Sequence, residues 1–106
     1  EGYATVKAIE KLGQIHHVLS NKIMEALNKH EVLKNLFNRE AAQFKIQALT
    51  EAAHKVYQTW HRLCDRQVVY WLDEHPYATR ETFIAFLNEI YSVKEMIERF
   101  GEVIFK

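Results

Sequence analysis

The sequence predicts an all-α protein, an antiparallel bundle of three long helices, with a short connecting fourth helix as an option. The 106 residues include only three Gly and one Pro, which tight turns need and helix interiors avoid. No Asn-Gly or Asp-Gly dipeptide marks a two-residue hairpin, and no segment alternates apolar and polar residues over the length of a strand. Apolar residues recur every three or four positions instead, which is typical of the buried face of a helix.

This spacing predicts a first helix over Ala4–Lys29, with lysines on the face opposite the apolar residues. The pattern continues to Phe37, so the helix either extends that far or is followed by the short connecting helix. The apolar positions are Ile9, Leu12, Ile15, Leu19, Ile23 and Leu27.

A second helix is expected between Asn38 and Pro76, because proline disfavours helical geometry in the residue before it. A heptad-like seam runs along this helix and a second stripe lies beside it, so we expect contacts with neighbours on two sides. The seam comprises Ile46, Leu49, Ala53, Val56, Trp60, Leu63, Gln67 and Tyr70, and the second stripe comprises His54, Tyr57, His61, Cys64, Val68 and Trp71.

A third helix is expected to begin with Thr79 as its N-cap and to end at Gly101, a residue type that commonly terminates helices. Ser92 begins a Ser-x-x-Glu pattern of the capping-box type, so a kink or a restart at Ser92 is the alternative. The apolar tail at 103–105 is expected to pack back on the bundle or against another chain.

Composition and charge limit the classes of function that the chain can have. The length fits a single domain over residues 1–106. Fourteen basic side chains balance fourteen acidic ones, which removes the general electrostatic argument for binding nucleic acid or an anionic membrane. No apolar run approaches the roughly 20 residues of a membrane span. The single cysteine, Cys64, cannot form an internal disulfide, so a reducing, cytoplasmic location is expected.

Six histidines raise the alternative of a metal- or haem-binding bundle. His61 and Cys64 lie one turn apart and can share an ion with a histidine from another helix, whereas His54 and His61 are about 10 Å apart along a helix axis. The candidate metal ligands are His61 and Cys64, together with His54, which lies on the same side of this helix but is too far from His61 to share one ion with it. The other interpretation is that these histidines are partly buried, hydrogen-bonded side chains beside the Trp60 seam.

Two further histidines, His16 and His30, fall in heptad register with Ile9, Ile23 and Phe37. We interpret them as polar seam residues that set the register of the packing, with a pH-sensitive seam as the alternative.

The run Trp71–Thr79, followed by Phe83 and Leu87, resembles the last two helices of death-fold adaptor domains. It covers about a third of the chain, and an unbroken second helix departs from the short helices of that family. The resemblance implies an interaction module and does not determine the fold expected here.

No Gly-rich phosphate loop, Gly-x-Ser-x-Gly elbow or Cys-x-x-Cys pair is present, so neither an enzymatic activity nor a cofactor is expected. The sequence favours a non-enzymatic helical protein–protein interaction or assembly domain, an adaptor or regulatory module. Its expected partner is a protein, either a second copy in a homo-oligomer or the rest of a parent protein. Trp60, Trp71 and the tail at 103–105 are the residues expected to make the contact.

Overall fold

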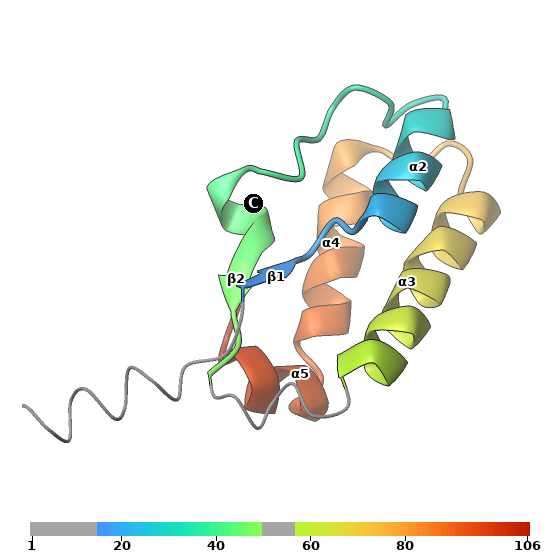
Figure 1. Cartoon of the computed structure of the whole chain (residues 1–106). Coiled ribbons are helices and arrows are strands. Elements are labelled where there is room, and N and C mark those ends of the chain that lie inside the picture. Colours follow the sequence, from blue (N-terminus) through green and yellow to red (C-terminus); the bar gives the residue numbers. More distant parts are fainter. Residues whose placement is uncertain (1–14, 50–56) are drawn as a thin grey trace, which may run out of the picture.

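A computed structural model describes residues 15–49 and 57–106, in the second range with side chains from His61 onward. Helices of modest length pack beside a two-stranded antiparallel sheet, so the prediction of an all-α bundle of three long helices is wrong (Figure 1). The elements are β1 (Ile15–His17), α2 (Asn21–Lys29), the 3-10 turn η1 (Ala42–Phe44), β2 (Lys45–Gln47), α3 (Tyr57–Glu74), α4 (Arg80–Tyr91) and α5 (Lys94–Phe100).

The predicted first helix, Ala4–Lys29, is wrong over residues 15–20, and its residues 4–14 lie outside the described part of the chain. Its residues 15–17 form β1, in which Ile15 lies opposite Gln47 of β2. The helix begins only after Ser20, whose hydroxyl accepts a hydrogen bond from the Ile23 N–H. Ser20 satisfies an N–H group that the first helical turn leaves open, and this gives α2 its own start.

The region between Asn38 and Pro76 is likewise not one helix. Its first part contains η1 and β2, and α3 is described over Tyr57–Glu74. The predicted end before Pro76 is confirmed. Residues 31–36 form turns in place of the optional short helix, and Asn35 adopts a left-handed conformation with a φ of 66°.

Both predicted ends of the third helix are confirmed, and so is the alternative of a break at Ser92. The Thr79 hydroxyl caps α4 in a reciprocal box with Thr82, and Gly101 ends α5 with a φ of 77°. Between them, α4 stops at Tyr91 and α5 restarts at Lys94. Ser92 forms no capping box there, because its hydroxyl donates to the Glu89 carbonyl at 2.8 Å.

The apolar tail packs back on its own chain. The Phe105 ring stacks on Phe44 with centroids 5.8 Å apart and meets the Tyr91 ring edge-on at 5.3 Å. The Asn88 side chain donates to the Phe105 carbonyl at 3.1 Å and accepts from its N–H at 2.7 Å. The tail thus closes the core, whose largest fully buried apolar side chains are Leu19, Ile23, Leu27, Leu33, Val68, Phe83, Leu87 and Tyr91. No described helix is both long and apolar enough to cross a membrane.

Candidate functional site

Two of the predicted metal ligands, His61 and Cys64, lie in a polar cluster inside the protein. We call it the inner polar cluster and define it by His16, His61, Cys64, Asp65 and Tyr91. The His16 Nε2 atom is hydrogen-bonded to the Tyr91 hydroxyl at 2.7 Å, and the His16 ring meets the His61 ring edge-on with centroids 5.2 Å apart. The cluster therefore joins β1, α3 and the end of α4.

Local structure explains why His16 points inward. Successive side chains of a strand face opposite sides, and in β1 the middle residue is the buried one. The His16 ring is 1 % exposed and stacks on Phe100 of α5 at a centroid distance of 5.0 Å. The heptad spacing predicted His16 on a helical seam, so its contact with His61 was not expected from the sequence.

The Cys64 thiol has a raised pKa. Its pKa is raised from 9.0 to about 12, chiefly by burial and secondly by the neighbouring Asp65 carboxylate, while a hydrogen bond with the Tyr91 side chain lowers it. At neutral pH the thiol is therefore protonated, whereas a nucleophile or a metal ligand must be a thiolate.

Asp65 links the cluster to the start of α2. Its Oδ1 atom accepts a hydrogen bond from the Ser20 hydroxyl at 2.8 Å, and its Oδ2 atom lies 3.4 Å from Nδ1 of His61. The same Ser20 oxygen caps α2, so one hydroxyl connects the helix start to α3.

The third predicted ligand, His54, lies outside the described residues. Across residues 15–49 and 57–106, no group of three His, Cys, Asp or Glu side chains is arranged to hold a metal ion. Ring contacts and hydrogen bonds of the cluster pack β1 against α3, α4 and α5.

The other seam histidine, His30, is also buried and hydrogen-bonded. Its Nδ1 atom accepts from the N–H groups of Val32 and Leu33, at 3.2 and 3.1 Å. Because Nδ1 is an acceptor, Nε2 carries the proton and donates to the His75 carbonyl at 2.8 Å. His30 thereby joins the end of α2 to the turn between α3 and α4.

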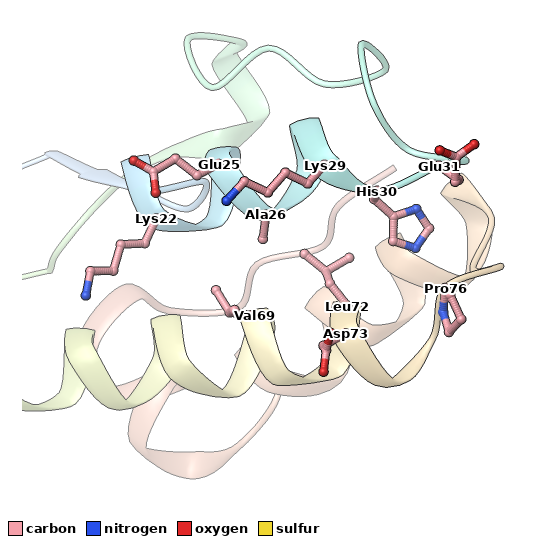
Figure 2. Close-up of a pocket in the computed structure, with 10 residues that line it drawn as sticks. All are labelled: Lys22, Glu25, Ala26, Lys29, His30, Glu31, Val69, Leu72, Asp73 and Pro76. Atoms are coloured by element: carbon pink, nitrogen blue, oxygen red, sulfur yellow. The ribbon is translucent and has the colours of Figure 1, made fainter.

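A groove of about 530 Å³ runs between α2 and α3 (Figure 2). Ala26 faces Leu72 across its floor, and charged side chains surround it. Cations and anions interleave along its walls, so the groove favours no ligand of a single charge sign. Its charged lining residues are Lys22, Glu25, Lys29, Glu31 and Asp73.

The predicted seam of the second helix faces solvent where it lies on α3 and its side chains are described, whereas Ile46 lies in β2 and packs against the core. Leu63 and Tyr70, seven residues apart, are 56 % and 65 % exposed, and Gln67 between them is also exposed. The neighbouring stripe is the buried one, with Cys64 and Val68 in the core. We call the solvent side the outer face of α3 and define it by Leu63, Arg66, Gln67, Tyr70, Asp73 and Glu74.

The residues expected to contact another chain are largely used within this one. Trp71 stacks on Phe86 of α4 with ring centroids 4.5 Å apart, and Phe105 is 2 % exposed. The Trp60 side chain lies outside the described set. In the tail, Ile104 remains 75 % exposed.

Comparisons with models of protein families, with curated proteins and with solved structures find no match to this chain.

Proposed function

We propose that this chain is a non-enzymatic protein–protein interaction or assembly domain, an adaptor or regulatory module that binds its partner through the outer face of α3. The observation that carries the proposal is the exposure of Leu63 and Tyr70 in helical register, on a helix whose opposite side already packs in the core. Apolar anchors seven residues apart on one helical face are a common mode of protein recognition. Fully burying one such side chain contributes about 1.5–3 kcal/mol before the costs of association.

The arrangement of the chemical groups supports a binding role over a catalytic one. The His16–Tyr91 pair is sealed in the interior, and the Cys64 thiol is protonated at neutral pH. Catalytic groups need access to a substrate and a pKa suited to proton transfer or attack. Among the side chains of α3 that the structure describes, from His61 onward, the most exposed apolar ones lie on its outer face instead.

A comparison of two matched variants tests the proposal. The tagged wild-type chain, Leu63→Glu and Leu36→Glu are used to capture proteins from an extract of cells that produce this chain. Leu36 is the control because it is 51 % exposed, close to the 56 % of Leu63, and lies in the turn at 31–36.

We expect the wild type and Leu36→Glu to retain the same protein, whether another copy or a different chain, and Leu63→Glu to lose it by at least about tenfold. Equal capture by Leu63→Glu and the wild type would contradict the proposal, provided circular dichroism shows both to be folded.

A further inference from the structure

We propose that the outer face of α3 binds a second copy of this chain, with the two α3 helices antiparallel about a two-fold axis that passes at Tyr70. This inference rests on the proposed function and names its partner. It is carried by the order of charged and apolar side chains along the outer face, which is self-complementary when the helix is reversed.

The charges of the outer face define the direction. Arg66 precedes Tyr70 by four residues and Glu74 follows it by four, and both are exposed. Residues four apart lie on the same side of a helix, so the three side chains form one row. When a second helix lies antiparallel and centred on Tyr70, Arg66 of each copy faces Glu74 of the other. A parallel pair would place Arg66 against Arg66, which is repulsive.

Two further pairs of side chains lie at equal sequence distances before and after Tyr70. Gln67 and Asp73 are three residues on either side of Tyr70, so in this arrangement Gln67 of one copy lies level along the helix axis with Asp73 of the other. Leu63 lies seven residues before Tyr70 and Tyr77 lies seven after it, just beyond the end of α3. Tyr77 is 84 % exposed, and the antiparallel arrangement brings it to Leu63 of the second copy.

The centre of the proposed interface is accessible and chemically suited to a two-fold axis. Tyr70 is 65 % exposed, and α3 lies at the margin of the molecule with α2 and α4 to one side (Figure 1). At the axis each Tyr70 meets its own counterpart, and two tyrosine rings pack favourably in an offset stack.

The size of the surface predicts a weak dimer. The 18 residues of α3 make a helix about 27 Å long. One face of such a helix is small beside the roughly 800 Å² per partner of a stable interface. We therefore expect a dissociation constant on the order of 100 µM.

Charge reversal with rescue tests the partner and its orientation. Sedimentation equilibrium of the wild type from about 10 µM to about 1 mM should reveal a monomer–dimer equilibrium. Arg66→Glu and Glu74→Lys should each weaken the dimer by about tenfold, since each replaces two attractive contacts by two repulsive ones. The double variant should recover the wild-type constant, and Glu98→Lys on α5 should leave it unchanged. A monomeric wild type, or a double variant without recovery, would overturn the inference.

Disulfide trapping gives a second readout at the axis. Tyr70→Cys should form a disulfide-linked dimer under mild oxidation, because the two-fold axis brings the two copies of this position together. Val93→Cys, 49 % exposed at the start of α5, is the control and should remain monomeric. Cys64 is retained because it is buried.

The two proposals fail in different ways. A dimer that Leu63→Glu dissociates but that Tyr70→Cys does not trap overturns the antiparallel arrangement and leaves the outer face of α3 as the docking surface. Equal capture by the wild type and Leu63→Glu from the extract overturns the docking surface itself.

Discussion

His16 in β1 and Tyr91 at the end of α4 share a hydrogen bond of 2.7 Å in the protein interior, although 75 residues separate them in the sequence. Each residue is 1 % exposed, so neither side chain can exchange this bond for one with bulk water. The bond ties the small sheet to the helical part of the core.

Replacing Tyr91 by Phe should therefore destabilise the protein by about 1–3 kcal/mol, because the change removes the hydroxyl while keeping the ring. Urea denaturation at low micromolar concentration measures the difference in the free energy of unfolding. Tyr70→Phe is the matched control, since Tyr70 is 65 % exposed and should change the stability by less than about 0.5 kcal/mol. Equal effects of the two variants would show that the buried bond contributes nothing.

The sequence predicted best those helix boundaries that a cap residue or a proline marks locally. These boundaries depend on contacts with neighbours a few residues away in the sequence, so they can be predicted from local sequence alone. The residues that mark them are Pro76, Thr79 and Gly101. β1 is different, because it depends on pairing with β2 thirty residues later. A strand of three residues is too short to show alternation, and Ile15 matched the helical spacing by coincidence. Ser20 was the one local signal that α2 starts there.

The buried Cys64 thiol should make stability depend on pH in the alkaline range. Its pKa is raised from 9.0 to about 12, chiefly by burial, so the folded state holds the proton more tightly than the unfolded chain. The resulting stabilisation is fully present below about pH 9 and is lost as the pH rises toward 12.

Cys64→Ser isolates this contribution, because a serine hydroxyl does not ionise in that range. Between pH 8 and pH 10.5 the wild type should lose on the order of 1–2 kcal/mol more stability than Cys64→Ser. Urea denaturation at the two pH values gives both differences. A parallel decline of the two proteins would mean that the thiol ionises as readily in the fold as outside it.

The pair formed by Asn88 and the Phe105 backbone holds the tail on the core. Asn88→Asp keeps an oxygen for the Phe105 N–H but replaces the donor to the Phe105 carbonyl by a negative charge. We expect a loss of about 1–3 kcal/mol in urea denaturation and faster removal of the last residues by carboxypeptidase. Asn28→Asp on the exposed side of α2 should change neither measurement.

The sequence also predicted only some of the residues of the candidate site. His61 and Cys64 lie one turn apart on α3, so their proximity follows from helical spacing. Their companion His16 comes from the sheet and Tyr91 from α4, and such contacts arise from tertiary packing. The heptad seam of α3 was recognised, yet whether it or the adjacent stripe is buried depends on where α2 and α4 lie. Periodicity alone does not determine that choice.

His30 provides a last prediction, in which two substitutions separate its two ends. Its Nδ1 atom accepts from two backbone N–H groups after α2, and its Nε2 atom donates to the His75 carbonyl. His30→Ala leaves all three backbone groups without this partner and should destabilise the protein by about 2–4 kcal/mol.

In His30→Asn the amide oxygen can accept from the N–H two residues later, as asparagine does in turns, but the side chain is too short to replace Nε2. In urea denaturation His30→Asn should therefore lose about half as much free energy of unfolding as His30→Ala, because the local bond from the Val32 N–H is kept and the long-range bond to the His75 carbonyl is lost. If the two variants are equally unstable, His30 acts through the His75 contact alone. If His30→Asn is as stable as the wild type, the bond between the end of α2 and the turn after α3 contributes nothing to folding.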